Sequence, residues 1–301
     1  MFTRGFFVRT TQVLCISTLA TLASTAPASS ASATAQNVAC SQTALRDAID
    51  TANASPDSNT LNLARNCPYQ LTTELPAITT PITINGNSAT LTRTSGSFRI
   101  LTVDGGNLTL RSAVIADGDA TGSPLVTGAG GGIVVTGNGT LTVTGSVIKD
   151  NHADFGGGIS VFNGSQAHLT GTVVRGNSAT RNGGGLVNDG TLTVKASQIS
   201  RNTADGAGGG IANIGTLTVT ASNIADNTAQ TGGGIANGVP SAPGGTTTVS
   251  FSRISHNHAD DDNPGGIYNN QGTVTLRTTV VAANTPNNCR TSPTTVPGCF
   301  N

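Results

Sequence analysis

The sequence has few charged and few aromatic residues. Only 10% of its 301 residues are charged, 3% are aromatic, and none is tryptophan. A compact globule would need larger apolar side chains, whereas a solenoid can build its core from small aliphatic residues in stacked coils. Basic and acidic residues are equal in number, at 15 each. Because there is no basic excess, we expect neither nucleic acid nor an anionic membrane as a partner.

Two short phrases recur along the chain with a period of about 25 residues. The first is Gly-Gly-Gly-Ile or a close variant, and its apolar residue stands at Ile133, Ile159, Leu186, Ile211, Ile235 and Ile267. The second is Ile/Val-x-x-Asn, and its asparagine stands at Asn151, Asn177, Asn202, Asn227, Asn257 and Asn284. A fixed period of this length indicates one structural coil stacked on the next.

A third phrase, Gly-Thr-Leu-Thr-Val, lies between the other two at 139–143, 190–194 and 215–219, with variants at 245–249 and 272–276. Apolar and polar residues alternate strictly in it, which indicates a strand with one buried face. Each coil thus offers three short strands separated by turns rich in Gly, Asn and Asp. We predict an all-β fold, a parallel β-helix solenoid with three strands per coil and about nine coils, roughly 40–45 Å long.

The repeated asparagines are expected to stack inside the corners of the coil. The second-phrase asparagines form one column, and a second column follows the Gly-Ile phrase at Asn188, Asn213, Asn237 and Asn269. Stacked amides donate and accept along a column and satisfy backbone groups at buried turns. We therefore interpret both columns as structural ladders rather than as a polar binding row. The glycine triplets permit tight corners and close approach of the coils.

Residues 1–35 have the pattern of a secretion signal. A basic start precedes a moderately apolar run from Val13 to Leu22, and a stretch of small residues ends at Ala35. This pattern predicts a signal peptide that is cleaved before Gln36. The apolar run is too short and too rich in Thr and Ser for a membrane anchor, so no membrane span is expected.

The remaining chain divides into a solenoid, residues 76–285, and two caps. The N-terminal cap is predicted over 36–75, where Ser41 can start a helix that runs to about Asn53 with one apolar stripe. The C-terminal cap is predicted over 286–301, because its three prolines cannot continue the strand ladder. An open solenoid exposes its core and its strand edges, so both ends need covering.

Four cysteines remain after removal of the signal: Cys40, Cys67, Cys289 and Cys299. An even number in an exported chain indicates disulfides. Three pairings are possible. We favour Cys40–Cys67 with Cys289–Cys299, because each pair lies at its own end of the rod.

Several parts of the chain resemble known families. The segment 40–53, followed by Asn-Thr-Leu-Asn-Leu-Ala at 59–64 and Cys-Pro-Tyr at 67–69, resembles the CSLREA-like N-terminal region of secreted bacterial right-handed β-helix proteins. The tail from Asn288 to Cys299 is similar to the ends of those proteins. The repeats resemble those of polymorphic outer-membrane proteins, with Ile or Val in place of Phe and without that family's autotransporter barrel. The resemblance implies a right-handed, pectin-lyase-like β-helix, a group in which many members act on polysaccharides.

The sequence offers no convergent catalytic set. Glycoside hydrolysis needs two carboxylates across the scissile bond, but the single glutamate, Glu74, lies near the cap and the aspartates are mostly one per turn. The only lysines, Lys149 and Lys195, are two coils apart. The phrases that mark polygalacturonase-like hydrolases and pectate lyases are missing as sets.

We predict from this a secreted, monomeric, non-catalytic scaffold, extracellular or at the cell surface. It would contact a glycan, a cell-envelope component or a partner protein through its faces and variable turns. The alternative is a polysaccharide lyase or glycoside hydrolase of the pectin-lyase-like group. Acids from three adjacent coils meeting in one groove would favour that alternative. No cofactor is expected.

The densest ionic cluster is a lengthened turn with two imidazoles and three acids: His256, His258, Asp260, Asp261 and Asp262. Flexible, oxygen-rich loops suit Ca²⁺, and an imidazole pair suits a transition metal. A solvated turn is the simpler interpretation of this composition. We therefore expect at most millimolar-range Ca²⁺ affinity here, of the extracellular-module type, and no catalytic role.

Overall fold

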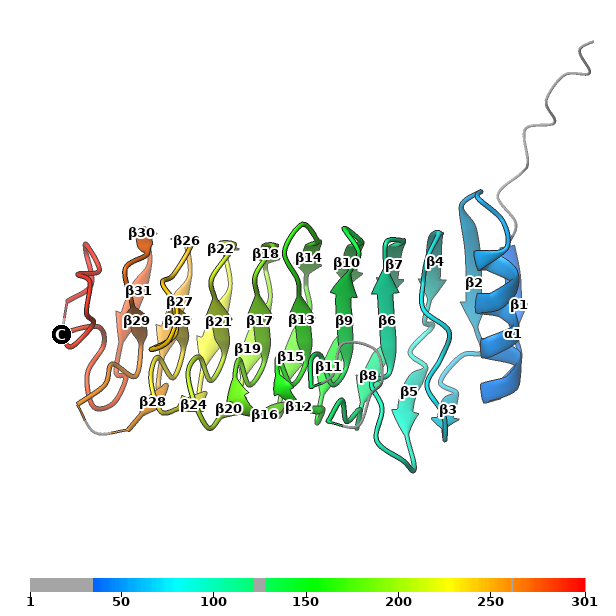
Figure 1. Cartoon of the computed structure of the whole chain (residues 1–301), viewed down its shortest axis with the longest axis horizontal. Coiled ribbons are helices and arrows are strands. Elements are labelled where there is room, and N and C mark those ends of the chain that lie inside the picture. The colour runs from blue at the N-terminus through cyan, green and yellow to red at the C-terminus, as the bar shows by residue number, and fades with distance from the viewer. Residues whose placement is uncertain (1–34, 122–127, 261, 301) are drawn as a thin grey trace, which may run out of the picture. The chain divides into compact units, whose positions relative to one another are not determined.

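A computed structural model describes residues 35–121, 128–260 and 262–300. These residues form a rod of parallel β-coils with about nine turns, as the repeats predicted (Figure 1). Of the predicted signal segment 1–35, all but Ala35 lies outside the described residues. The fold class expected from the sequence is therefore confirmed.

Four parallel sheets run along the rod, named A to D here. Sheet A contains β1 (Ala35–Val38), β2 (Asn59–Leu63), β4 (Pro81–Asn85), β7 (Asn107–Arg111), β10 (Thr140–Thr144), β14 (Gln166–Thr170), β18 (Thr191–Lys195), β22 (Thr216–Thr220), β26 (Thr246–Ser250) and β30 (Thr273–Arg277). Sheet B contains β3 (Pro68–Leu71), β5 (Thr90–Arg93), β8 (Val114–Ala116), β11 (Val147–Lys149), β15 (Val173–Arg175), β19 (Gln198–Ser200), β23 (Asn223–Ala225), β27 (Arg253–Ser255) and β31 (Val280–Ala282).

The other two sheets close the coil. Sheet C contains β6 (Leu101–Asp104), β9 (Ile133–Thr136), β13 (Ile159–Val161), β17 (Leu186–Asn188), β21 (Ile211–Asn213), β25 (Ile235–Asn237) and β29 (Ile267–Asn269). Sheet D contains β12 (His152–Phe155), β16 (Ser178–Asn182), β20 (Thr203–Ala204), β24 (Thr228–Ala229) and β28 (His258–Ala259). In a middle coil the chain passes through A, B, D and C in that order.

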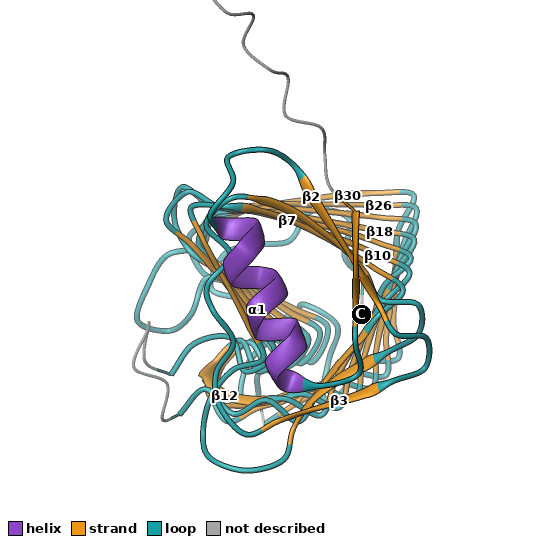
Figure 2. Cartoon of the chain, turned by 90° about the vertical axis from the view of Figure 1, so that its right-hand side faces the viewer, coloured by secondary structure: helices purple, strands orange, loops and turns teal. Residues whose placement is uncertain are grey.

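The coil is right-handed. Figure 2 views the rod from its N-terminal end, with the strands of sheet A at the top, β3 of sheet B at the lower right and β12 of sheet D at the lower left. The chain therefore turns clockwise as it recedes from the viewer. Equivalent residues pair from coil to coil, as Leu192 of β18 does with Leu217 of β22.

Sheet D adds a fourth strand to the middle coils, beyond the three predicted from the sequence. Three of its strands have only two residues, which is too short to show a period of two. Each begins directly after a ladder asparagine and places an alanine inward, and this column is buried at Ala153, Ala179, Ala204, Ala229 and Ala259. The recurring Asn-x-Ala phrase was the available signal.

Stacking of like residues builds the core. The inward residue of each middle strand of sheet B is fully buried, at Ile148, Val174, Ile199, Ile224 and Ile254. Burying one such side chain stabilises the fold by about 1.5–3 kcal/mol. Because each coil buries its apolar residues against the next one, the core is continuous along the rod.

Helix α1 (Gln42–Asn53) covers the N-terminal end of the core, as predicted (Figure 2). Ser41 Oγ accepts a hydrogen bond from the Ala44 N–H at 3.2 Å, and the helix buries Leu45, Ala48, Ile49 and Ala52. No helix among the described residues is long and apolar enough to cross a membrane. Strands β2 and β3, and all of β1 except Ala35, lie within the segment predicted as the cap, so the sheets begin before residue 76.

Both predicted disulfides are present. Cys40 bonds to Cys67 and Cys289 bonds to Cys299, with sequence separations of 27 and 10 residues. One bond ties the residue before the N-cap of the helix to the residue before β3, and the other closes the C-terminal tail on itself.

Candidate binding groove

The asparagines of the first column form a continuous buried ladder. At each of the five steps from Asn151 to Asn284, one Oδ1 accepts from the backbone N–H and the Nδ2 of the asparagine one coil earlier, at 3.0 and 2.9 Å. None of the six is more than 6% exposed. Their hydrogen-bonding capacity is used inside the fold, so these side chains cannot hold an external ligand.

The second column is also internal. Asn188 donates to Asn213 Oδ1 at 2.7 Å, and the chain of amides continues through Asn237 to Asn269 at 2.9 and 3.0 Å. All four residues are buried. The first column therefore lies at the corner between sheets B and D, and the second lies at the end of the sheet C strands.

A ladder of hydroxyl side chains, which the sequence analysis did not predict, runs along the corner between sheets A and B. Ser197 Oγ accepts from the Thr172 N–H at 3.0 Å, Ser222 Oγ from the Ser197 N–H at 3.1 Å, and Ser252 Oγ from the Ser222 N–H at 3.1 Å. Each hydroxyl residue stands five positions before a ladder asparagine, and this constant spacing was the signal. These bonds satisfy backbone groups where the chain bends sharply.

A groove of about 680 Å³ follows this corner over successive coils. We call it the corner groove. It is lined by Gly171, Thr172, Val173, Ala196, Ser197, Gln198, Ala221, Ser222, Asn223, Phe251, Ser252, Arg253 and Thr278. The ladder hydroxyls lie beneath it, and the first residues of the sheet B strands form one wall.

One row of the groove has a left-handed backbone and mostly small side chains. Gly171, Ala196 and Ala221 have φ values of +57°, +46° and +49°. In the next coil the same turn position holds Phe251, with φ +51° and 67% of its surface exposed. An exposed aromatic ring therefore stands where the preceding coils leave open space.

A second row carries hydrogen-bonding side chains. Gln198, Asn223 and Arg253 pair in register on adjacent coils, one above the other. Asn223 Oδ1 is buried and has no hydrogen-bond partner among the described residues. Buried acceptors are normally satisfied, so this oxygen is an unused acceptor at the groove wall.

The surroundings of the corner groove are positively charged. Arg253 lies in the groove, and the exposed Lys195 and Arg277 end sheet A strands in one register column beside it. The lining residues include no Asp or Glu. The groove therefore favours ligands that carry negative charge or many hydrogen-bond acceptors.

The outer face of sheet D places a histidine, a hydroxyl and a carboxylate on neighbouring coils. His152 Nδ1 lies 2.9 Å from Ser178 Oγ in the next coil. Asp119 lies in the coil before His152 and forms a parallel backbone bridge with it. Burial opposes the ionisation of Asp119, but hydrogen bonds from Thr121 and the charges of His152 and Arg93 hold the pKa of Asp119 below its usual range.

The set of Asp119, His152 and Ser178 does not have the geometry of an activated serine nucleophile. The Oδ1 atom of Asp119 accepts from the N–H and the hydroxyl of Thr121 at 3.0 and 2.6 Å. A catalytic base needs its second nitrogen oriented by a third group. His258 Nδ1 repeats the same contact with Thr285 Oγ1 at 3.0 Å. The His–hydroxyl pair is thus a recurring contact between coils.

The glutamate at the N-terminal end has a structural setting. Arg99 is fully buried. Burial lowers the pKa of the Arg99 guanidinium to about 10, and the charge of Glu74 opposes this shift. Glu74 also accepts a hydrogen bond from Thr102 at 3.4 Å, and its backbone oxygen accepts one from Arg46. Glu74 therefore sits beside a buried cation, away from the corner groove.

The predicted metal cluster is spread over the end of sheet D. His256, His258, Asp260 and Asp262 are exposed, and Asp261 lies outside the described residues. In the part of the chain that the structure describes, no three His, Cys, Asp or Glu side chains gather as metal ligands. His258 and Asp260 instead line a polar recess with Gln230, Thr231 and Asn263.

The corner groove is the candidate functional site, because it combines an exposed ring, an unsatisfied acceptor and cations in one line. The carboxylates Asp119 and Asp154 lie on sheet D or its flanking turn, not in this groove. Comparison of the chain with protein-family models, with curated proteins and with solved structures finds no match.

Proposed function

We propose that the protein is a secreted, non-catalytic β-helix scaffold that binds a glycan chain along the corner groove. The observation that carries the proposal is the alignment of Phe251 with Gln198, Asn223 and Arg253 in one groove. An exposed aromatic ring gives a sugar an apolar stacking surface, and the polar row supplies hydrogen bonds to its hydroxyls.

The repeat of the groove supports an extended polymer as the ligand. Equivalent side chains recur once per coil, at about 4.8 Å. This spacing is of the same order as one sugar unit in an extended chain. Successive sugars can therefore meet equivalent groups, and weak contacts add along the polymer.

The charges favour a glycan that carries carboxylate or sulfate groups. Lys195, Arg253 and Arg277 stand along the groove without an acid among its lining residues. Binding should therefore weaken with added salt, since exposed charges are screened.

Secretion is part of the proposal. The signal-like pattern of residues 1–35 and the two disulfides support export to an oxidising compartment. The pectin-lyase-like resemblance of the repeats supports a glycan partner by fold-level analogy. The cell envelope is a suitable source of such a polymer, and a single rod suffices for binding.

Affinity gel electrophoresis tests the proposal. We expect polygalacturonate or alginate in the gel to retard the protein, and hydroxyethylcellulose to retard it less. Phe251→Ala should weaken binding about tenfold, given the usual worth of a buried aromatic contact. Phe300→Ala is the matched control, because Phe300 is 81% exposed and lies outside the groove.

Two results would refute the proposal. The groove is not a glycan site if no polymer retards the protein, or if both phenylalanine variants behave alike. Release of reducing ends or of 4,5-unsaturated products above background would instead establish the lyase or hydrolase alternative.

A further inference from the structure

A second polar hollow lies on the far side of the coil from the corner groove. We call it the sheet D recess. It has a volume of about 540 Å³ and is lined by Gln230, Thr231, His258, Asp260 and Asn263. These residues follow or belong to β24 and β28. Sheet D lies at the lower left in Figure 2, whereas sheets A and B meet at the right.

The recess contains a buried hydroxyl with no partner. Thr231 is only 5% exposed, and its Oγ1 makes no hydrogen bond among the described residues. Its bridge partner one coil earlier is Ala207, which has no polar side chain. A buried hydroxyl without a partner destabilises the native state, so the fold alone does not account for threonine here.

The other lining side chains also have free hydrogen-bonding capacity. Gln230, Asp260 and Asn263 make no side-chain hydrogen bond to another described residue, although backbone bonds hold the turn: the Asp260 N–H donates to Gln230 O at 3.3 Å. His258 uses Nδ1 for Thr285 and keeps Nε2. The recess thus presents donors and acceptors from two adjacent coils.

We propose that the sheet D recess binds a neutral hexose unit. A carboxylate can accept from two neighbouring hydroxyls of a sugar, and the amides and Thr231 can supply the remaining bonds. The lining includes no Lys or Arg, and Asp260 would repel a uronate. This site extends the proposed glycan-binding function to a second ligand class, but it does not depend on the corner groove.

Saturation-transfer difference NMR with D-glucose, D-galactose and D-mannose as separate probes tests the recess. We expect at least one hexose to bind the full chain. Thr231→Val should weaken this binding about tenfold, which is the worth of one lost hydrogen bond of about 1.4 kcal/mol. Thr203→Val, an exposed threonine of β20 outside the recess, is the matched control.

Thermal unfolding of the same variants separates a ligand role from a structural one. Because Thr231 Oγ1 has no partner, Thr231→Val should leave the Tm unchanged or raise it. Binding should persist in Phe251→Ala, which distinguishes the recess from the groove. The proposal is overturned if no hexose binds, if Thr231→Val binds as wild type, if its Tm falls, or if Ca²⁺ alone occupies the recess and is lost in Asp260→Asn.

Discussion

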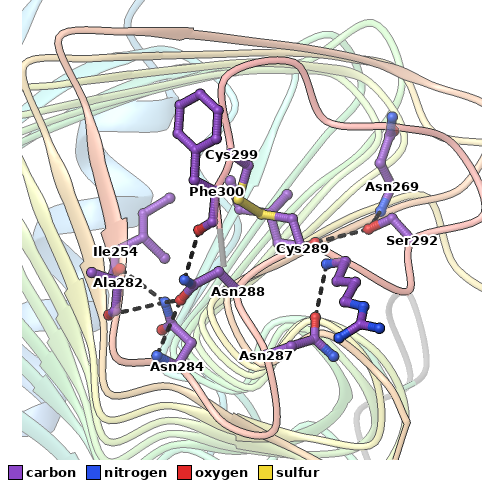
Figure 3. Close-up of a disulfide and its surroundings, with 12 residues drawn as sticks. Ile254, Asn269, Ala282, Asn284, Asn287, Asn288, Cys289, Ser292, Cys299 and Phe300 are labelled. Atoms are coloured by element: carbon purple, nitrogen blue, oxygen red, sulfur yellow. Dashed lines mark hydrogen bonds between the residues drawn. A yellow bond between two sulfur atoms is a disulfide. The ribbon is translucent and has the colours of Figure 1, made fainter.

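Asn288 accepts from Asn284 the hydrogen bonds that the ladder asparagine of a further coil would accept. Its Oδ1 accepts from the N–H and the Nδ2 of Asn284 at 3.2 and 2.9 Å, which is the contact that each ladder asparagine makes with the next (Figure 3). The two residues are only four positions apart, whereas the ladder steps span 25 to 30. Asn288 Nδ2 then donates to the Phe300 backbone oxygen at 2.9 Å. The tail thus ends the ladder without an orphaned amide.

Removal of this terminator should destabilise the C-terminal coils. Asn288→Ala leaves the buried Asn284 N–H without its acceptor, which costs about 1–3 kcal/mol. Urea unfolding followed by circular dichroism measures the change. Asn163→Ala is the control, since Asn163 is exposed and its loss should change the free energy by less than about 0.5 kcal/mol. Equal effects of the two variants would contradict the capping role.

The two disulfides should contribute unequally. Their separations of 27 and 10 residues correspond to loop-closure contributions of about 3.6 and about 2.7 kcal/mol in the chain-entropy model. Cys40→Ser/Cys67→Ser should therefore lower the urea midpoint more than Cys289→Ser/Cys299→Ser. The reverse order would show that native packing at the tail outweighs loop length.

The sequence predicted the coil because each coil repeats the same demands. Most strands of sheet A place apolar residues inward, so Leu192 and Leu217 recur in phase. The ladder asparagines recur for the same reason. Asn288 could not be found this way. It makes the hydrogen bonds of a ladder asparagine, but the repeated phrase that surrounds the other ladder asparagines is missing around it. Its role depends on the path of the tail, which a local pattern does not specify.

The corner groove was also beyond a local pattern. Ala196, Ala221 and Phe251 look unrelated in sequence, and only the register of the coils aligns them in one left-handed row. The unsatisfied Asn223 oxygen depends on side-chain surroundings that a motif does not encode. Sequence reasoning instead singled out the charged turn at 256–262 as a weak metal candidate, with a solvated turn as the simpler interpretation, because the density of charge can be read without a structure.

Asp119 should make stability depend on pH. Its folded pKa is depressed, so its contribution is present above the unfolded pKa of about 3.9 and is lost as pH falls through the folded value. Asp119→Asn should cost roughly 1 kcal/mol at pH 7, through weaker bonds to Thr121. In urea titrations the cost should shrink as the pH falls through the folded pKa of Asp119. Asp205→Asn, at an exposed position, serves as the control, and a cost that does not depend on pH would contradict the charged role.

Export should remove residues 1–35. The intact mass of protein recovered from the periplasm of a bacterial host should match a chain that starts at Gln36. Ala33→Arg with Ala35→Arg should block processing, because the cleavage site needs small residues. Recovery of an exported chain that retains Met1 would contradict a cleaved signal.

Phe251 should trade stability for binding. Non-glycine residues in the left-handed region cost about 1–2 kcal/mol, and Gly171 occupies the equivalent turn with φ +57°. Phe251→Gly relieves this strain and loses little buried area, because the ring is 67% exposed. Glycine loses more conformational entropy on folding, which lowers the free energy of unfolding by about 0.5–1 kcal/mol. We therefore expect a net gain of roughly 0.5 kcal/mol in urea unfolding, together with weaker retardation by polygalacturonate.

Ala196→Gly separates the two effects. Ala196 has φ +46° in the same row, so its replacement relieves comparable strain without removing a ring. It should gain similar stability and retain glycan binding. If Phe251→Gly is instead less stable than wild type, the ring is held by packing. The contacts of the ring would then explain why phenylalanine is present at this strained turn, and ligand binding would not be needed as an explanation.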